Sequence, residues 1–377
     1  MQLRWVGAWA AAPQLVEEHN LPPSPGLASN TLRQVVRTSI GGEKIRIRLS
    51  NEYGQSNLEI QALHIAIAEQ GSQIRAGTDQ PVTFAGKPSV IVPPGQSVIS
   101  DAIDYSIPKL TTIALTIHFG AVPIEMTGHP GSRTTSYIMP GCAHTMLAMP
   151  DAVTTDHWYY ITGIDIAAQD SETVAIAALG DSLTDGRGTT ANGNDRWTDV
   201  LAERLQANQP TAKVGVLNMG LGGNAVLRGG LGPTLLSRFE RDCLKLPGVR
   251  YAVILAGVND IGVVQNEDDT AERLIEAYRF FVTKAHQHNI RVYGGTILPF
   301  GESWYYTPIR EQIRQKVNNW IRTSNLFDAV IDFAAAVQDP ENPHCLCKIY
   351  DSGDMLHLNP LGYRRMGEVI DLELFTK

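Results

Sequence analysis

The spacing at which apolar residues recur along the chain changes near residue 170. Of all features of the sequence, this change most restricts the folds that the chain can adopt. Before it, apolar and polar residues alternate, as in residues 45–49 (IRIRL), and residues 63–67 (LHIAI) follow the same style. Glycine and proline turn signals separate these runs, and no helical periodicity interrupts them. Short alternating runs are typical of antiparallel strands with one buried face. We therefore predict an antiparallel β-sandwich over residues 1–168.

Beyond residue 172, apolar runs alternate with amphipathic segments. The runs suit strands buried on both faces, and they cover residues 174–179, 214–217, 251–256, 292–298 and 329–331. Apolar residues recur at helical spacing over residues 271–285, with Thr270 as the expected N-cap, and again over residues 309–321. This alternation predicts an α/β domain over residues 172–377, with a parallel sheet covered on both faces. Active sites of such sheets lie at the carboxyl ends of the strands.

The composition argues against several classes of protein. The chain of 377 residues is 43% hydrophobic and has a formal net charge of −8, with its basic residues scattered, so the basic face that binds nucleic acid is not expected. No apolar stretch approaches the ~20 residues that span a bilayer. The first residues lack the features of a signal peptide, so we expect a cytoplasmic protein or a trimmed, secreted form. Four cysteines are too few for a disulfide scaffold.

The tetrapeptide Gly180-Asp181-Ser182-Leu183 directly follows the first of the buried strands. A serine at such a strand end, opened by a glycine, lies where an α/β enzyme places a nucleophile. Its hydroxyl is a poor nucleophile at neutral pH and needs a base nearby. The same serine could instead cap the next helix, so the tetrapeptide does not decide between the two roles.

A glycine-rich segment, residues 218–225, follows the second strand. Gly220, Gly222 and Ala225 match the dinucleotide pattern G-x-G-x-x-A. That pattern should follow the first strand of its unit, and the next strand should end in an acidic residue, whereas here it ends in Gly257. A glycine loop can instead present a backbone N–H to a developing oxyanion.

Polar side chains also follow the third strand and the last one. Asn259 carries a neutral amide donor that can stabilise an oxyanion, although an Asn-Asp pair also forms turns. Asp354 and His357 lie three residues apart, on one face of a helical turn or tight loop. The carboxylate can there hold the imidazole tautomer and stabilise its protonated form. Asp332, at the end of the fifth strand, is the alternative acid.

These segments together resemble the four motif blocks of the SGNH/GDSL hydrolase family, in the same order along residues 172–377. The blocks are residues 180–183, 218–223, 257–260 and 354–357. The resemblance implies a flavodoxin-like three-layer α/β/α fold. The opening segment, residues 5–9, and the β-rich region after it resemble a bacterial subgroup with an N-terminal β-sandwich or jelly-roll extension. In several relatives this extension borders the active site or aids carbohydrate engagement.

The resemblance also implies a role for each site residue. Ser182 would be the nucleophile, His357 the general base and Asp354 its orienting partner. The oxyanion hole would consist of the backbone N–H groups of Ser182 and Gly223 and the side-chain amide of Asn259. No metal and no organic cofactor are expected.

We therefore predict a serine esterase that acts through an acyl-enzyme on short acyl esters, above all O-acetyl groups on carbohydrate. No long apolar lid segment is visible, which argues against long-chain triglycerides. The aromatic run Trp304, Tyr305 and Tyr306 follows the fourth strand and could stack on a sugar, line an acyl pocket or pack against the next helix. Lysophospholipase or thioesterase activity is the alternative. A third hypothesis is a catalytically inactive carbohydrate-binding protein. The intact motif residues argue against it.

Overall fold

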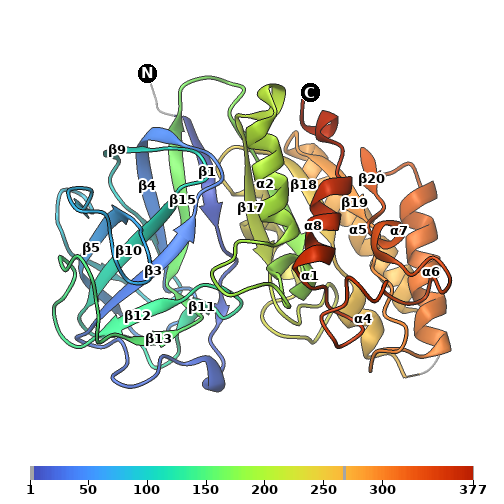
Figure 1. The fold of residues 1–377 in the computed structure, drawn as a ribbon, viewed down its shortest axis with the longest axis horizontal. Coiled ribbons are helices and arrows are strands. Elements are labelled where there is room, and N and C mark those ends of the chain that lie inside the picture. Colours follow the sequence, from blue (N-terminus) through green and yellow to red (C-terminus); the bar gives the residue numbers. More distant parts are fainter. Residues whose placement is uncertain (1–3, 266–268, 377) are drawn as a thin grey trace. The chain divides into compact units, whose positions relative to one another are not determined.

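The chain folds into two compact units that divide between Gln169 and Asp170 (Figure 1). The computed structural model describes residues 4–265 and 269–376. Within these residues, none of the helices has the length and hydropathy of a membrane-spanning segment. The four cysteines are all free thiols.

The first unit is built from antiparallel strands, as predicted. One sheet has the order β1-β15-β4-β8, with β9 also paired to β4; a larger one has the order β13-β12-β3-β10-β5-β6, with β7 paired to β5; the smallest has the order β14-β11-β2. Their bounds are β1 Arg4–Ala10, β2 Gln14–Leu15, β3 Thr31–Arg37, β4 Gly42–Ser50, β5 Leu58–Ile67, β6 Gln80–Val82, β7 Val90–Val92, β8 Ser97–Ile99, β9 Ile103–Ile107, β10 Thr112–Phe119, β11 Thr127–His129, β12 Ser136–Met139, β13 Val153–Thr155, β14 Trp158–Tyr159 and β15 Ile161–Ala168. A short 3₁₀ turn, η1, covers Glu18–Asn20.

Strand β4 shows why the alternating pattern predicts a sheet with one buried face. Ile45, Ile47 and Leu49 are fully buried, whereas Arg46 and Arg48 between them keep part of their surface exposed. Successive side chains of a strand point to opposite faces, so the alternation of the sequence becomes an apolar and a polar face.

The second unit has the predicted three-layer α/β/α fold around a parallel sheet of order β17-β16-β18-β19-β20. The strands are β16 Val174–Gly180, β17 Val214–Gly220, β18 Val249–Leu255, β19 Arg291–Gly295 and β20 Ala329–Ile331. The helices are α1 Ser182–Asp185, α2 Trp197–Ala207, α3 Leu235–Phe239, α4 Val258–Gly262, α5 Thr270–Gln287, α6 Pro308–Thr323, α7 Phe333–Val337 and α8 Pro360–Val369, with short turns η2 Gln209–Thr211, η3 Glu240–Leu244 and η4 Leu372–Phe375.

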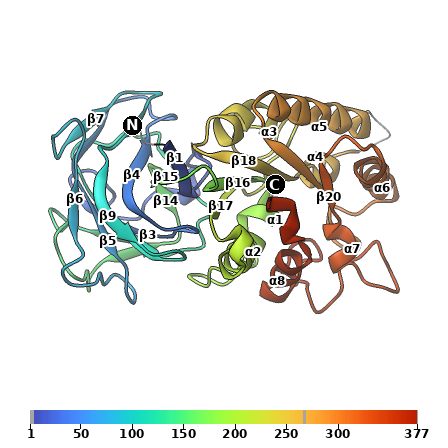
Figure 2. The ribbon, with the colours of Figure 1, turned by 90° about the horizontal axis from the view of Figure 1, so that it is seen from above.

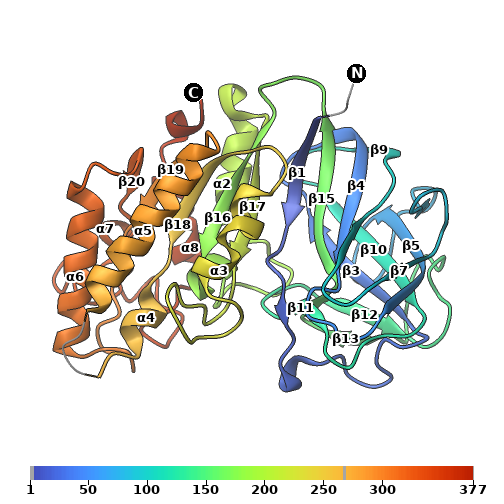
Figure 3. The ribbon, with the colours of Figure 1, turned by 180° about the vertical axis from the view of Figure 1, so that it is seen from behind.

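The helices cover both faces of this sheet. Figure 2 shows α2, α7 and α8 on one side and α3 and α5 on the other. In Figure 3, α3 and α5 lie in front of the sheet, whereas α2 and α8 lie in front of it in Figure 1. The strands are buried on both faces, which explains their continuous apolar runs.

Several predicted boundaries are wrong. The third strand, predicted over residues 251–256, spans Val249–Leu255. Strand β17 continues beyond residue 217 to Gly220, because its backbone pairs with that of Gly180 and pairing needs no side chain. The fourth strand ends at Gly295 rather than at residue 298. Asp269 occupies the N-cap position of α5, so Thr270 is its first helical residue. Helix α6 covers the predicted residues 309–321.

Candidate active site

Ser182 lies at the carboxyl end of β16, where the chain turns directly into the short helix α1. Gly180 allows this tight entry, because a Cβ at this position would lie 2.2 Å from Thr184 Oγ1 and 2.4 Å from the carbonyl oxygen of Leu255. The Asp181 carboxylate accepts a hydrogen bond from the Leu183 N–H and therefore caps α1. The cap is thus Asp181, and the buried Ser182 side chain makes a different contact.

The Ser182 hydroxyl contacts a histidine that lies 175 residues later in the chain. Its Oγ is 2.8 Å from His357 Nε2. On the other side of the ring, His357 Nδ1 is 2.7 Å from Asp354 Oδ2. With Nδ1 protonated, His357 donates to the carboxylate and its Nε2 accepts the proton of the serine hydroxyl. The three side chains therefore form one continuous chain of hydrogen bonds.

The loop from Asp354 to His357 fixes the carboxylate as well as the imidazole. Asp354 Oδ1 accepts from the backbone N–H groups of Leu356 and His357, at 3.0 Å and 2.7 Å. Met355 has a φ of 62°, which bends the chain tightly enough to bring these groups together. Partial burial opposes ionisation of Asp354, but the hydrogen bonds from His357 outweigh it and hold its pKa below the ordinary value. Asp354 is thus an ionised acceptor at neutral pH.

Two backbone N–H groups lie in the segments that carry the expected oxyanion hole. Ser182 begins α1, so its N–H has no partner within the helix. Gly223 has a φ of +66°, and a Cβ there would lie 3.0 Å from the Leu231 side chain. The Gly223 carbonyl accepts from the Leu231 N–H at 2.9 Å, so the segment doubles back as a closed loop. Among the described residues, no acceptor binds either the Ser182 or the Gly223 N–H.

Asn259, in α4, is the third expected oxyanion donor and lies buried between two partners. Its Nδ2 donates to the backbone carbonyl of Asn224 at 2.9 Å. Its Oδ1 accepts from the Tyr305 hydroxyl at 2.8 Å. One N–H of the Asn259 amide remains without an acceptor among the residues that the structure describes.

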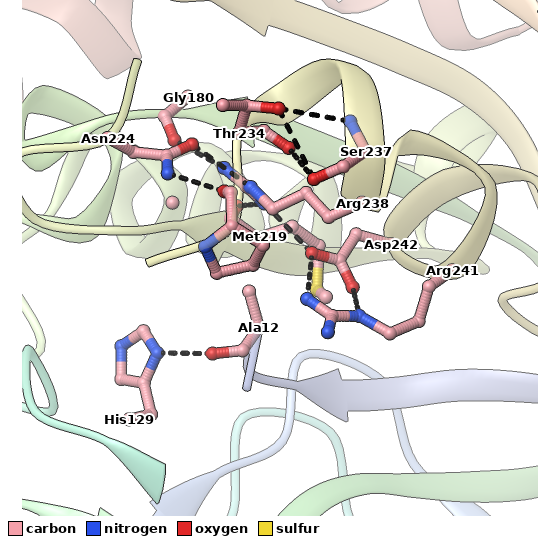
Figure 4. Close-up of polar contacts among 12 residues, drawn as sticks. Ala12, His129, Gly180, Met219, Asn224, Thr234, Ser237, Arg238, Arg241 and Asp242 are labelled. Atoms are coloured by element: carbon pink, nitrogen blue, oxygen red, sulfur yellow. Dashed lines mark hydrogen bonds and ion pairs between the residues drawn. The ribbon is translucent and has the colours of Figure 1, made fainter. Parts of the chain in front are cut away.

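A buried arginine that the sequence analysis missed holds the glycine-rich loop against the strand ends (Figure 4). Arg238 donates to the carbonyls of Gly180 and Met219, at 2.8 Å and 2.7 Å, and to Asn224 Oδ1 at 3.0 Å. Its charge is paired with Asp242 at 2.9 Å. Burial and the ion pair with Asp242 fix the Arg238 guanidinium in place. Its hydrogen bond to Asn224 Oδ1 therefore holds the Asn224 side chain in one orientation. An Arg and an Asp four residues apart were the only sequence signal, and surface helices carry the same pattern.

The other residues that the sequence singled out lie outside the hydrogen-bonded chain of Ser182, His357 and Asp354. The Asp332 carboxylate binds Arg322 and Thr296 and caps α7, so the structure does not bring it to His357. Trp304 is 60% exposed, and its ring centroid lies 6.4 Å from that of His357. Tyr306 is also exposed, at 39%. The pattern at residues 220–225 is followed by a loop, not by the helix that a dinucleotide site needs.

The described residues contain no group of three or more His, Cys, Asp and Glu side chains arranged to hold a metal ion. The contacts described above offer a hydroxyl, an imidazole, a carboxylate and neutral N–H donors. Such a set can move a proton and stabilise a negative oxygen.

Comparison with known proteins gives a family for this region. Residues 178–365 match the model of the GDSL-like Lipase/Acylhydrolase family. No match was found among curated proteins.

Solved structures resemble about half of the chain. A GDSL-like lipase from Bacteroides thetaiotaomicron is 20% identical with a TM-score of 0.39, over 54% of this chain and 88% of that one. An acetylxylan esterase from Geobacillus stearothermophilus, solved as a catalytic mutant, is 20% identical with a TM-score of 0.41, over 52% and 91%. A lipolytic G-D-S-L protein from Veillonella parvula is 18% identical with a TM-score of 0.39, over 54% and 99%. These similarities identify no substrate.

Proposed function

Residues 178–365 form a domain of the GDSL-like lipase/acylhydrolase family, and we propose that this domain is a serine esterase that acts through an acyl-enzyme. The observation that carries the proposal is the chain of hydrogen bonds from Ser182 through His357 to Asp354. Residues so far apart in sequence meet at the carboxyl ends of the parallel strands, where α/β enzymes bind their substrates.

In the proposed reaction, Ser182 Oγ attacks the ester carbonyl carbon while His357 Nε2 takes the hydroxyl proton. Asp354 stabilises the resulting imidazolium and keeps its ring in place. The carbonyl oxygen becomes negative and is held by the N–H groups of Ser182 and Gly223 and by the Asn259 amide. His357 then gives its proton to the leaving alcohol, which departs and leaves an ester on Ser182.

The second half of the reaction uses the same groups in reverse order. His357 takes a proton from a water molecule, and the hydroxide oxygen attacks the acyl carbon of the acyl-enzyme. The oxyanion forms again at the same three donors and collapses to the free acid. His357 returns the proton to Ser182 Oγ, so the enzyme is restored without any further group being consumed.

For the substrate, we propose short acyl groups, above all O-acetyl esters on carbohydrate. The exposed Trp304 ring beside His357 supports this assignment, because a flat apolar face next to the base can stack on a sugar ring that carries the ester. A Cβ at Gly223 would lie 3.0 Å from the Leu231 side chain, so Leu231 lies close to one expected oxyanion donor.

The Ser182→Ala variant tests the chemistry. It should hydrolyse p-nitrophenyl acetate at least ~10³-fold more slowly than the parent, since the nucleophile is lost while the oxyanion donors remain. Labelling of the parent, but not of the variant, by a fluorophosphonate probe would show that Ser182 is activated. Retention of near-parental turnover by Ser182→Ala would disprove the mechanism.

The substrate is tested separately, by comparing acetyl, octanoyl and palmitoyl esters and by measuring acetate release from acetylated polysaccharides. We expect the highest kcat/KM for acetyl esters. A clear maximum at long chains would favour the lysophospholipase or thioesterase alternative and leave the serine mechanism intact.

A further inference from the structure

The side-chain amide of Asn259 can serve as an oxyanion donor only in one of its two orientations. Its Nδ2 lies 2.9 Å from the backbone carbonyl oxygen of Asn224, which can only accept. A flipped amide would bring two oxygens together at this contact. The orientation is thus fixed by chemistry, and the amide oxygen must point the other way, where it meets the Tyr305 hydroxyl at 2.8 Å. Tyr305 donates to Asn259 Oδ1.

Tyr305 is itself held by contacts on several sides. Its ring lies against Gly262, where a Cβ would come within 2.5 Å of ring carbons. Its backbone N–H donates to Ser303 Oγ, and its carbonyl accepts from Arg310 at 3.0 Å. Arg310 also donates to the carbonyl of Val264 at 2.7 Å, beyond the end of α4. The hydroxyl is therefore presented to Asn259 by a fixed backbone.

Burial of the Tyr305 ring, assisted by the nearby Asp181, raises the pKa of its hydroxyl above the ordinary value of 10.0. The Tyr305 hydroxyl therefore stays protonated over the whole pH range in which an imidazole base works. It remains a hydrogen-bond donor at every pH that matters for hydrolysis.

We propose that Tyr305 is a positioning residue that sets the orientation of the Asn259 amide and strengthens its remaining N–H as an oxyanion donor. The inference rests on the proposed esterase function and assigns Tyr305 a role that differs from the three roles that the sequence left open. The proposed role depends on the two contacts of the Asn259 side chain, with the Asn224 carbonyl on one side and the Tyr305 hydroxyl on the other.

The physical reason is polarisation along a chain of hydrogen bonds. Donation by Tyr305 to Oδ1 draws electron density from the amide nitrogen, so the Nδ2–H groups become better donors. The effect grows when the substrate oxygen becomes negative, so it acts on the transition state more than on the bound ester. Loss of Tyr305 should therefore lower kcat and leave KM nearly unchanged.

The test is a double-mutant cycle with the full-length protein and p-nitrophenyl acetate. Tyr305→Phe removes the hydroxyl and keeps the ring against Gly262. We expect it to lower kcat by about 10- to 100-fold, within the loss of a single oxyanion donor, with KM changed by less than about twofold. In an Asn259→Ala background, the same substitution should change kcat by less than about twofold, because its target is gone.

Tyr278→Phe is the matched control. The Tyr278 hydroxyl is buried and donates to the backbone carbonyl of Ala256 at 2.6 Å, close to the same strand end. Its removal should lower the midpoint of urea unfolding but leave kcat within about twofold of the parent value. The comparison separates the loss of a buried tyrosine hydrogen bond from the loss of the bond to Asn259.

Two results would overturn the inference in a parent enzyme whose hydrolysis depends on Ser182. One is an unchanged kcat for Tyr305→Phe. The other is an equal fold loss with and without Asn259, which would mean that Tyr305 acts only on general structure. Absence of any Ser182-dependent hydrolysis by the parent protein would instead overturn the proposed function, and this inference with it.

Discussion

Each unit of the molecule contains a histidine paired with an aspartate at nearly the same N···O distance. In the second unit, His357 Nδ1 lies 2.7 Å from Asp354 Oδ2, and in the first, His64 Nδ1 lies 2.8 Å from Asp79 Oδ2. The surroundings of the two pairs differ. His357 faces the Ser182 hydroxyl at 2.8 Å, whereas the His64 ring packs against His144, with 4.7 Å between ring centroids.

Because of this difference, we propose a catalytic role for the His357–Asp354 pair and none for the His64–Asp79 pair. Among the described residues, no hydroxyl forms a hydrogen bond with His64. Another histidine of the first unit contacts a backbone carbonyl: His129 Nδ1 lies 2.9 Å from the Ala12 oxygen (Figure 4). In antiparallel sheets, polar residues are spread along whole faces. In the second unit the parallel strands end at one edge, so loops from distant parts of the sequence meet there.

The largest expected effect separates the two histidines. His357→Ala should lower kcat/KM for p-nitrophenyl acetate by about 10⁴- to 10⁶-fold, since His357 Nε2 is the base in contact with the Ser182 hydroxyl. His64→Ala, which removes the same ring from the other pair, should leave kcat/KM within about twofold. Similar losses in both variants would show that the effect comes from folding and not from catalysis.

A smaller effect is expected for the two carboxylates. Asp354→Asn should lower kcat by about 10³- to 10⁴-fold, because an amide cannot stabilise the imidazolium and can select the wrong imidazole tautomer. Asp79→Asn serves as the paired control and should hydrolyse the same ester at the parental rate. An Asp354→Asn enzyme with more than a tenth of the parental kcat would contradict the assigned orienting role.

The smallest effect concerns stability and contrasts two buried aspartates. Asp165 of the first unit faces Arg46 and Arg48, at 2.9 Å and 3.2 Å. Asp181 is also buried, and burial, together with the nearby charge of Asp260, raises its pKa to about 7 from the ordinary 3.8. Arg238 opposes this rise without cancelling it. Folded protein therefore holds a proton on Asp181 at pH values where the unfolded chain has released it.

The sign of the pH dependence follows from this proton. The contribution of Asp181 to stability is complete below about pH 4 and is lost as the pH rises to about 7. Asp181→Asn cannot ionise and keeps an oxygen for the Leu183 N–H. Relative to the parent, it should gain up to about 4 kcal/mol of unfolding free energy between these pH values. Urea unfolding at pH 5 and pH 8 measures the part of this gain that falls between the two pH values, roughly 2 to 3 kcal/mol.

Asp165→Asn provides the opposite case. It removes the carboxylate that faces two arginines, so it should destabilise the protein at both pH values. An Asp181→Asn gain that is equal at pH 5 and pH 8 would show that Asp181 does not carry the raised pKa.

Much of the fold could be predicted, because periodicity reports burial directly. The alternation over residues 45–49 and the continuous run over residues 174–179 indicated an antiparallel and a parallel region, and both are confirmed. The family resemblance is confirmed over residues 178–365. Boundaries were less certain, since Gly220 belongs to β17 through backbone pairing that no side-chain pattern reveals.

The candidate site also has a part that the sequence predicted and a part that it did not. Strand-end position and the family resemblance together gave Ser182, Asn259, Asp354 and His357 as candidates, because each follows a strand or lies in a short loop. The partners of these residues were not predictable. For Tyr305 the sequence left open a contact with the substrate or packing against the next helix, and it did not predict the hydrogen bond of its hydroxyl to Asn259. Arg238 was not considered at all.

The sequence by itself thus determined the two kinds of sheet and the residue types available for acyl transfer, since both depend on local pattern. Only the tertiary structure decided that Asp181, and not Ser182, caps α1, so that the Ser182 hydroxyl meets His357. It also decided which aspartate faces this histidine. The physical reason is that these contacts join segments far apart in the chain, and their distances depend on the packing of helices and loops around the whole sheet.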